Sequence, residues 1–509
     1  MAFETAVRNP ERYKGILTAL LPFKNSILNE DKLLEIVSTF YLNGIVSSDG
    51  ITIYEDSTIE SISDDVIEVN STRKADGGFP FGYASRFWTY VRTLSELGFV
   101  YAQFNKQLKF SQTAIMLIEN KLDDQEAFSI QAMKYNRKSP YRNVSNDFNF
   151  FRFILKVLLL LKKENKALSF EQFIVATFSN DGNEKEFIET ITKNKFKDDE
   201  SAFNFIKKVY KTNTRIATVT KDYPDVVKRI LIISGFITIR YTSKKFIEIN
   251  ESKLDYINEL LKINFKLEED EKADAEKYFK KLDSVNKEYL AVIGKYKEKD
   301  KLDGEVYANK VFDIIKAYKI DEKIIVESIY RLGSGKTAVI AEFQEIPNYL
   351  KLEFYISILI ALKYGNSFAI RPNYKADHIG KPYSQAPGGF GDIEIYSKKI
   401  YWLIEVTLIR NKTQQLNHET TSVIRHLFSN EEFKNHLSKY LSFIAPVVHD
   451  DTREFYDYSV IKNRKEGNTI SIKPYSVDEF VNTTVAINNF ADMDKYTSDV
   501  IQNFKANFN

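Results

Sequence analysis

Two acidic residues flank a short polar break in the segment that runs from Gly391 to Thr407. Asp392 precedes the break Ser397-Lys398-Lys399, and Glu405 follows it. β-Branched and aromatic residues fill both flanks, which is typical of two strands joined by a tight turn. A turn centred between Lys398 and Lys399 sets Asp392 opposite Glu405, because opposed residue numbers in an antiparallel pair have a constant sum.

Side chains alternate between the faces of a strand, so this register predicts a polar and an apolar face. The polar face carries Asp392, Glu394, Leu403, Glu405 and Thr407, and the apolar face carries Ile393, Ile395, Trp402, Ile404, Val406 and Leu408. Opposed carboxylates repel each other unless a positive charge lies between them. Oxygen ligands suit Mg²⁺, which leaves positions for water and phosphate. The pattern therefore indicates a metal site for phosphodiester hydrolysis, and a surface hairpin with solvated acids is the alternative.

Two predicted helices flank this hairpin in the sequence. The run 347–365 is apolar almost all round, which predicts a buried helix, yet it carries Glu353 in its middle. A buried carboxylate needs a proton, a cationic neighbour or a metal. The second helix, at about 413–428, has a polar stripe that contains Glu419 and His426 beside an apolar stripe. Because this helix directly follows the Glu405 strand, its polar edge can return to the acidic face.

Six pieces of this region occur in an order that resembles the AlwI-like family of type IIS restriction endonucleases. The pieces are the helix with Glu353, Arg371-Pro372-Asn373-Tyr374, Ala386-Pro387-Gly388, Asp392-Ile393-Glu394, Ile404-Glu405-Val406-Thr407-Leu408, and Glu419 followed by Val423-Ile424-Arg425-His426-Leu427. The resemblance is strong over about 346–428 and weaker over the N-terminal half. A single piece would be uninformative, whereas six in the same order are specific.

The resemblance implies a nuclease core of the PD-(D/E)XK superfamily. Glu353, Asp392, Glu405 and the Val406 carbonyl would bind Mg²⁺, with Mn²⁺ as a substitute, and Glu419 and His426 would line the same catalytic pocket. The lysine that the superfamily has two residues after the second acid is Thr407 here, and a hydroxyl supplies no positive charge to the transition state. Glu419 could hold the water through a second metal or a hydrogen bond instead. His426 could move a proton or satisfy a core hydrogen bond.

Such an enzyme would bind a short asymmetric site in double-stranded DNA and cut at a fixed offset outside it, leaving a 5′-phosphate and a 3′-hydroxyl. The resemblance also implies a cognate DNA methyltransferase as a partner, and a transient homodimer on DNA or a second subunit. A strand-specific nicking endonuclease would share every residue named so far. A non-catalytic DNA-binding regulator with a degenerate nuclease fold is the alternative from a different class. The intact acids argue against it, although Thr407 leaves room for it.

Length and composition bound the rest of the chain. With 509 residues, two to four domains are expected. The absence of cysteine excludes disulfides, thiolate catalysis and cysteine zinc sites. The sequence has no membrane-spanning apolar run and no N-terminal signal segment, so we expect a cytoplasmic protein that makes no membrane contact. The resemblance implies that its host is a bacterium. The net charge of +2 decides nothing about DNA binding.

Local basic clusters are the candidate DNA contacts. They mix cations with Tyr, Ser or Asn donors that suit phosphates and base edges, although most charge clusters are simply solvated faces. The candidate residues are Arg73, Lys74, Lys134, Asn136, Arg137, Lys138, Arg142, Arg240, Lys244 and Lys245.

The N-terminal half contains a diverged repeat. Residues 88–111 and 223–249 each read as helix, glycine cap, strand, polar or basic turn, and strand, with the glycines at Gly98 and Gly235. This is the sequence outline of a winged helix, which commonly places one helix in the major groove and a wing on the backbone. Winged helices that mediate only protein contacts are the alternative.

The segment between the halves predicts a helical connection. Residues 268–304 are rich in charge and carry apolar residues at helical spacing, which indicates one long amphipathic helix. We therefore expect a multidomain α/β (α+β) protein with winged-helix-like DNA-recognition subdomains at 1–160 and 161–265, a helical linker at 266–340 and a PD-(D/E)XK-type mixed-sheet endonuclease domain at 341–509. The linker would set the distance between the recognition sequence and the cut.

Overall fold

The chain forms two compact units, Met1–Glu298 and Lys299–Asn509, each with its own hydrophobic core. The structure is a computed structural model, and it describes residues 7–48, 50–54, 56–70, 83–142, 144–242, 244–297, 304–386, 389–412, 415–429, 436–467 and 469–508. Within these ranges, no helix combines the length and the apolarity that crossing a bilayer would require.

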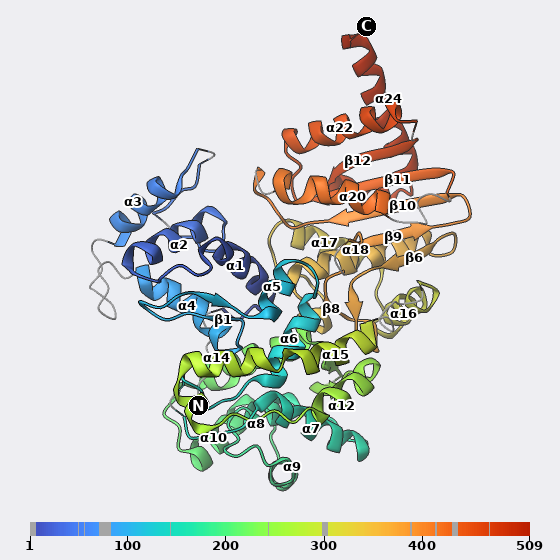
Figure 1. Cartoon of the computed structure of the whole chain (residues 1–509). Helices are drawn as coiled ribbons and strands as arrows, with labels where there is room; N and C mark the ends of the chain where they lie inside the picture. Colours follow the sequence, from blue (N-terminus) through green and yellow to red (C-terminus); the bar gives the residue numbers. More distant parts are fainter. Residues whose placement is uncertain are drawn as a thin grey trace. The chain divides into compact units, whose positions relative to one another are not determined.

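The N-terminal unit is built mainly from helices (Figure 1). Polar capping residues fix where several of them begin: Asn29, Ser111, Asp123 and Ser169 each accept a backbone N–H from the first turn. The helices are α1 (Tyr13–Leu20), α2 (Glu30–Leu42), α3 (Ile59–Asn70), α4 (Tyr83–Glu96), α5 (Gln112–Ile118), α6 (Asp124–Lys134), α7 (Phe150–Lys163), α8 (Phe170–Ala176), α9 (Glu184–Lys193), α10 (Asp199–Tyr210), α11 (Tyr223–Ile233), α12 (Leu254–Lys262), α13 (Glu269–Ala273), α14 (Ala275–Ser284) and α15 (Asn286–Lys297).

Two parts of this unit share one local arrangement. Helix α4 is followed by Gly98 and the hairpin of β1 (Val100–Tyr101) and β2 (Lys109–Phe110). Helix α11 is followed by Gly235 and the hairpin of β4 (Ile237–Tyr241) and β5 (Lys245–Ile249). Both glycines have a positive φ, 78° and 69°, which is the backbone that a glycine cap adopts. The predicted succession of helix, glycine and hairpin is confirmed in both copies.

An upstream segment pairs with the second strand of each hairpin. Strand β3 (Leu168–Ser169) is antiparallel to β5, which gives the sheet order β3-β5-β4. In the first copy Ile27 bridges Gln107, and the N–H of Leu108 donates to the carbonyl of Ser26 at 3.0 Å. Both copies therefore have a third extended segment, which makes the repeat larger than its sequence outline indicates.

The segment predicted to form one long connecting helix forms three shorter helices, α13, α14 and α15, so that prediction is wrong. Asp274 interrupts the helix because its carboxylate accepts the backbone N–H of Lys277 and caps the start of α14. Helix α14 packs through Phe279 against Tyr101, and it belongs to the N-terminal unit. Helices α16 (Gly304–Ala317) and α17 (Glu322–Gly333), which lie in the rest of the predicted linker 266–340, belong to the C-terminal unit.

The C-terminal unit is organised around a five-stranded mixed sheet in the order β12-β11-β10-β9-β6. Strand β10 is parallel to β11, which is parallel to β12, whereas β9 is antiparallel to both β10 and β6. The mixture of helix and sheet confirms the α/β (α+β) class. The remaining elements are β6 (Ala369–Pro372), β7 (Lys375–Ala376), β8 (Pro382–Ser384), β9 (Ile393–Tyr396), β10 (Ile400–Val406), β11 (Ser438–Ala445), β12 (Ile470–Ser476), α18 (Asn348–Tyr364), α20 (Thr421–Ser429), α22 (Asp450–Lys465), α23 (Val477–Val485) and α24 (Asn489–Phe508).

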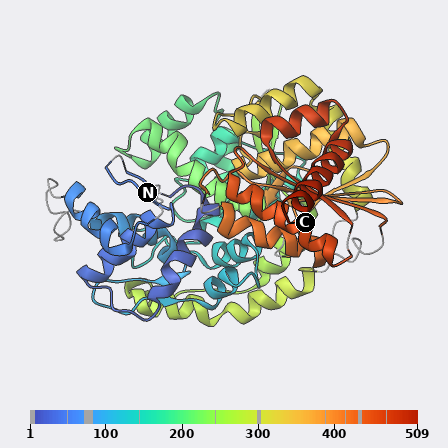
Figure 2. The same ribbon diagram turned by 90° about the horizontal axis from the view of Figure 1, so that it is seen from above.

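Helices cover both faces of this sheet, whose twist is visible in Figures 1 and 2. On one face Ile404 packs in a core with Leu359 of α18, the helix predicted from its apolar composition. On the other face Leu403 packs with Val423 of α20 and Tyr456 of α22. The β9–β10 hairpin is therefore central to the unit and is buried between two helical layers.

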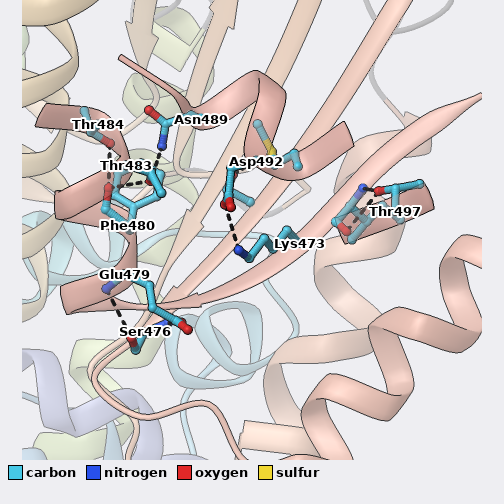
Figure 3. Close-up of polar contacts among 12 residues, drawn as sticks. Lys473, Ser476, Glu479, Phe480, Thr483, Thr484, Asn489, Asp492 and Thr497 are labelled. Carbon is cyan, nitrogen blue, oxygen red and sulfur yellow. Dashed lines mark hydrogen bonds and ion pairs between the residues drawn. The ribbon is translucent and has the colours of Figure 1, made fainter. Parts of the chain in front are cut away.

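Side-chain hydrogen bonds join the last strand and the last two helices (Figure 3). Lys473 of β12 donates to the Asp492 carboxylate of α24 at 2.7 Å. The Asn489 amide donates to the Thr483 hydroxyl of α23 at 2.8 Å, and its oxygen accepts from the Tyr364 hydroxyl of α18 at 3.0 Å. These contacts fix the corner between α23 and α24 without using any residue of the β9–β10 hairpin.

Candidate active site

The β9–β10 hairpin has the predicted register. The paired residues are Ile393 with Ile404, Glu394 with Leu403, Ile395 with Trp402, and Tyr396 with Tyr401. The N–H of Ser397 donates to the Ile400 carbonyl at 2.9 Å and closes the turn over the two lysines. Continued by one residue, the same register sets Asp392 opposite Glu405, as the sequence predicts.

The predicted alternation of faces is also confirmed. Ile393 and Ile404 are fully buried in the core that contains α18. Glu394 and Glu405 lie on the other face, where they are only 2% and 5% exposed. A surface hairpin with solvated acids is therefore excluded, because helices cover both faces of this hairpin.

Asp392 lies directly before β9 and is half-buried. Its Oδ2 accepts the backbone N–H of Val406 at 2.7 Å, which ties the acid to the last residue of β10. A carboxylate that accepts a backbone N–H is held in one orientation by a charge-assisted hydrogen bond. The Asp392 carboxylate is thus held next to the end of the strand that carries Glu405.

Glu405 contacts the histidine that the sequence predicts to return to the acidic face. Its Oε1 lies 3.0 Å from His426 Nδ1, and the His426 side chain is 22% exposed. The helix that carries this histidine is π-helical over Gln415–Thr420 before it continues as α20. Val423 and Leu427 of its predicted apolar stripe are buried against the sheet, so the orientation of the helix is confirmed.

Gly391 allows the backbone before Asp392 to pass very close to Glu405. A Cβ added at this position would lie 2.7 Å from Glu405 Oε1 and 2.4 Å from Leu403 Cδ1. Both distances are shorter than real Cβ contacts, so only glycine fits without displacing a neighbour. Nothing in the local sequence predicts a role for this glycine, because the contact depends on how closely β9 and β10 approach each other.

Asn373 is a second residue whose role the sequence alone does not predict. Its backbone N–H donates to the Asp392 carbonyl at 2.8 Å. Its side-chain amide donates to the Gly391 carbonyl at 2.7 Å and to Glu394 Oε1 at 3.0 Å. In the sequence, only its place in the motif Arg371-Pro372-Asn373-Tyr374 marks it, because its hydrogen-bond partners lie well beyond it in the chain.

The other predicted metal ligands are not gathered into one cluster. Glu353 is buried in α18 at 5% exposure, as predicted. The Glu419 side chain lies outside the described part of the structure. Among the residues that are described, no group of three or more histidine, aspartate or glutamate side chains is arranged to hold a metal ion. The metal-binding roles of Glu353, Asp392, Glu405 and the Val406 carbonyl therefore stay predictions.

Thr407 replaces the expected lysine and has a structural role in the turn after β10. Its N–H donates to the Ile444 carbonyl at 2.9 Å, and its hydroxyl accepts the N–H of Ile409 at 3.1 Å. The side chain is buried at 8% exposure. The hydroxyl thus turns the chain out of the sheet toward the helix that carries His426.

Lys134, one of the predicted DNA contacts, is fully buried, and for this residue the prediction is wrong. Its ammonium donates to the Leu282 carbonyl at 2.9 Å and to Asn286 Oδ1 at 2.6 Å. Burial lowers the pKa of Lys134 to about 7. The side chain joins α6 to the α14–α15 region and cannot reach a phosphate.

Two predicted arginines are also enclosed by protein, so their assignment to DNA is corrected as well. Arg137 is 1% exposed, donates to the Ser179 carbonyl at 2.7 Å, and has its pKa lowered to about 9 by burial. Arg142 forms an ion pair with the buried Glu96 at 2.9 Å. Both guanidinium groups satisfy partners within the N-terminal unit.

The remaining basic candidates lie at or near the surface, and their contact with DNA stays a prediction. Lys138 pairs with Glu269 at 2.6 Å, and Arg240 pairs with Glu248. The other contacts are Asn136 to Asp147 at 2.8 Å, Lys244 to the Lys197 carbonyl at 2.9 Å, and the Lys245 ammonium 4.6 Å from the Phe170 ring centre. Arg73 and Lys74 lie outside the described residues.

Similarity to known proteins extends across both units. The chain matches the AlwI restriction endonuclease family over residues 95–298 and 280–483, which together cover more than half of the chain. No curated protein matches it.

Three solved structures are similar to the chain in part. The small subunit (R.BspD6I2) of the heterodimeric restriction endonuclease R.BspD6I is 19% identical, over 35% of this chain and 86% of that chain, with a TM-score of 0.26. The BpuJ1 endonuclease binding domain, solved with pyrene- and phenanthrene-modified DNA, is 12% identical over 55% of this chain and 90% of that chain, with a TM-score of 0.32. Restriction endonuclease FokI is 11% identical over 94% of this chain and 95% of that chain, with a TM-score of 0.22. The match to the family itself spans both units and carries the assignment: the chain belongs to the AlwI restriction endonuclease family and is a DNA-cleaving enzyme.

Proposed function

We propose that this protein is a type IIS restriction endonuclease. Its N-terminal unit would bind a short asymmetric site in double-stranded DNA, and its C-terminal unit would hydrolyse phosphodiester bonds at a fixed offset outside that site. The observation that carries the proposal is the pair Asp392 and Glu405, set opposite each other at one end of the central hairpin with His426 in contact with Glu405. A cognate DNA methyltransferase, and a homodimer on DNA or a second subunit, are part of the same proposal.

The architecture of the C-terminal unit supports a PD-(D/E)XK-type core. Such a core carries its acids on a central antiparallel hairpin within a mixed sheet, and β9 and β10 form that hairpin here. Helix α18, with Glu353, packs on the face opposite to the one that carries Asp392 and Glu405. The acids therefore come from elements that a shared core holds together.

The donor atoms at this site fit a hard divalent cation. Asp392 and Glu405 offer carboxylate oxygens from adjacent strands, and Mg²⁺ prefers oxygen ligands, with Mn²⁺ as a chemically similar substitute. When bound, the cation would supply Lewis-acid chemistry to the scissile phosphate and the attacking water. Water and substrate oxygens would complete the ligand set, because Mg²⁺ sites commonly use only one or two carboxylates.

The groups around the two acids have separate roles. The Val406 N–H holds the Asp392 carboxylate in place. An ionised Glu405 carboxylate only accepts, so His426 then donates from Nδ1, and in the neutral imidazole the lone pair lies on Nε2. His426 can therefore orient Glu405 and accept a proton at Nε2 in the same tautomer. Thr407 supplies no charge because its hydroxyl is neutral, and that hydroxyl accepts the Ile409 N–H.

The repeated arrangement in the N-terminal unit supports winged-helix-like recognition subdomains. The helix, three extended segments and turn of each copy follow the order of a winged helix, whose helix enters the major groove. The two copies differ in what their helix exposes. Every residue of α11 is buried or half-buried, whereas Arg92 of α4 is exposed. We therefore assign base recognition to the first copy and a protein-packing role to α11.

One experiment tests the catalytic part. Purified protein is incubated with plasmid DNA and Mg²⁺, and the ends are sequenced: cuts at one fixed distance from a common sequence support the type IIS proposal. Nicked circles without linear product would indicate the strand-specific nicking alternative. Binding without any cut would indicate the degenerate regulator.

Substitutions then test the two acids. Asp392→Ala and Glu405→Ala should abolish cleavage and leave specific DNA binding in Ca²⁺ intact, because recognition belongs to the other unit. Asp492→Ala is a matched control, since it also removes a carboxylate of the same unit but pairs with Lys473. A variant of Asp392 or Glu405 that cuts at the wild-type rate would overturn the assignment.

A further inference from the structure

Asn373 joins three points of the segment that carries the first acid. The residue follows β6, and its backbone N–H donates to the Asp392 carbonyl at 2.8 Å. Its side-chain amide donates to the Gly391 carbonyl at 2.7 Å and to Glu394 Oε1 at 3.0 Å. One asparagine thus holds the residue before Asp392, Asp392 itself, and the residue two positions after it.

The orientation of the Asn373 amide follows from its partners. A carbonyl oxygen and a carboxylate oxygen both accept hydrogen bonds, so the nitrogen of the amide must face them. Glu394 is 2% exposed, and a buried carboxylate needs such donors. The contact is therefore directional, and an acceptor in place of the amide nitrogen would repel both partners.

These hydrogen bonds bear on the separation of the two acids. The Asp392 carboxylate is held on one side by the Val406 N–H of β10, and its backbone is held on the other side by Asn373 after β6. Gly391 passes so close to Glu405 that a Cβ would lie 2.7 Å from Oε1. If the backbone at Gly391 drifted, it would either press on Glu405 or withdraw Asp392 from it.

We propose that Asn373 is a positioning residue that sets the spacing between the Asp392 and Glu405 carboxylates, and with it the affinity of this site for a divalent cation. The inference rests on the proposed nuclease function of the site. Groups that orient metal ligands without touching the metal typically change metal affinity or activity by about 10- to 100-fold when they are replaced. Asn373 has that relation to Asp392.

The test uses the full-length protein and Asn373→Ala. Binding of Mn²⁺ is followed by electron paramagnetic resonance of the free ion, and single-turnover cleavage is measured against Mg²⁺ concentration. We expect Mn²⁺ binding about tenfold weaker or worse. The Mg²⁺ concentration for half-maximal cleavage should rise by a similar factor, while DNA binding in saturating Ca²⁺ stays unchanged. The backbone hydrogen bond to Asp392 remains in the variant, so the effect reports on the side chain.

Asn489→Ala is the matched control. Asn489 is fully buried in the same unit and also loses two side-chain hydrogen bonds, to Thr483 and Tyr364, at the α23–α24 corner shown in Figure 3. It should lower the unfolding temperature without changing the response to Mn²⁺ or Mg²⁺. An equal change of metal affinity in both variants would overturn the inference, because the effect would then be general loosening of the unit.

Two further substitutions separate hydrogen bonding from packing. Asn373→Leu keeps about the same volume but removes the donor without adding a charge, so it should weaken Mn²⁺ binding at least as much as Asn373→Ala. Asn373→Ser keeps a short donor and should fall between the wild type and alanine, and it also serves if Asn373→Ala fails to fold. Wild-type Mn²⁺ binding in Asn373→Leu would overturn the inference. If the wild-type protein itself neither binds Mn²⁺ nor cuts DNA, the proposed function fails instead.

Discussion

Replacing Gly391 with alanine should disable the candidate site with only a moderate loss of stability. The added Cβ would lie 2.7 Å from Glu405 Oε1 and 2.4 Å from Leu403 Cδ1, so at least one neighbour must move. Leu403 is 1% exposed and packs in the core between the sheet and α20, which prevents it from swinging into solvent. The Glu405 carboxylate, the Gly391 backbone or both must therefore shift.

The size of the effect follows from these distances. Overpacking a well-packed interior typically costs about 1 to 3 kcal/mol. For a unit of roughly 200 residues this corresponds to a fall of about 2 to 12 °C in Tm. Catalysis should suffer more, because misplacing reacting groups by about 1 Å can slow a reaction roughly 100-fold. A displacement of several tenths of an ångström at Glu405 should therefore slow cleavage by about 10- to 100-fold.

Two measurements check this prediction: single-turnover cleavage at saturating Mg²⁺, and thermal unfolding of the full-length protein. Gly15→Ala is the control, because Gly15 lies exposed on α1 and an added Cβ meets nothing within 4 Å. A helical glycine replaced by alanine should gain about 0.5 to 1 kcal/mol, with unchanged cleavage. If Gly391→Ala cuts at the wild-type rate, the close approach of Gly391 does not position Glu405, and the reasoning is refuted.

Three other predictions follow from side chains in both units. Burial lowers the pKa of Lys134 in the folded protein to about 7 from 10.5, so the unfolded chain binds this proton more tightly. Between these two pH values the unfolding free energy of the wild type, measured by urea denaturation, should therefore rise with pH relative to that of Lys134→Met. Arg152 donates to three carbonyls at the end of α12, to one at the end of α6 and to the Tyr289 hydroxyl. Arg152→Lys keeps the charge but loses most of these hydrogen bonds, so its unfolding free energy should be lower by about 3 kcal/mol in the same assay. An unchanged unfolding free energy would show that these bonds are dispensable. Glu419→Gln should slow single-turnover cleavage by about 100-fold or more if Glu419 positions water, and an unchanged rate would remove it from the site.

The hairpin could be predicted from the sequence because its determinants are local. The two-residue turn between Ser397 and Ile400 fixes the register, and the period of two assigns every following side chain to a face. The same holds for α18, whose apolar composition alone requires burial. The sequence alone therefore places Asp392 opposite Glu405, as the register of the hairpin does.

Lys134, Arg137 and Arg142 could not be distinguished from DNA contacts in the sequence, because the partners of a cation can lie anywhere in the chain. Lys134 is satisfied by Leu282 and Asn286, and Arg142 by Glu96, none of which is a sequence neighbour. A buried cation and a solvated one have the same local sequence. The role of Asn373 could not be predicted for the same reason, since its partners Gly391 and Glu394 are 18 and 21 residues away in the chain.

Thr407 stands where the resemblance leads us to expect a lysine, and its hydroxyl is hydrogen-bonded in the turn before the helix of His426. Position 407 is where the chain leaves the sheet, and the threonine hydroxyl accepts the Ile409 N–H in the turn toward the π-helix and α20. A lysine side chain has only donors, so it could not satisfy that N–H. Thr407 therefore helps to form the turn that precedes the helix whose histidine lies 3.0 Å from Glu405. Under the proposed function, the side chain that contacts Glu405 comes from the following helix and not from position 407.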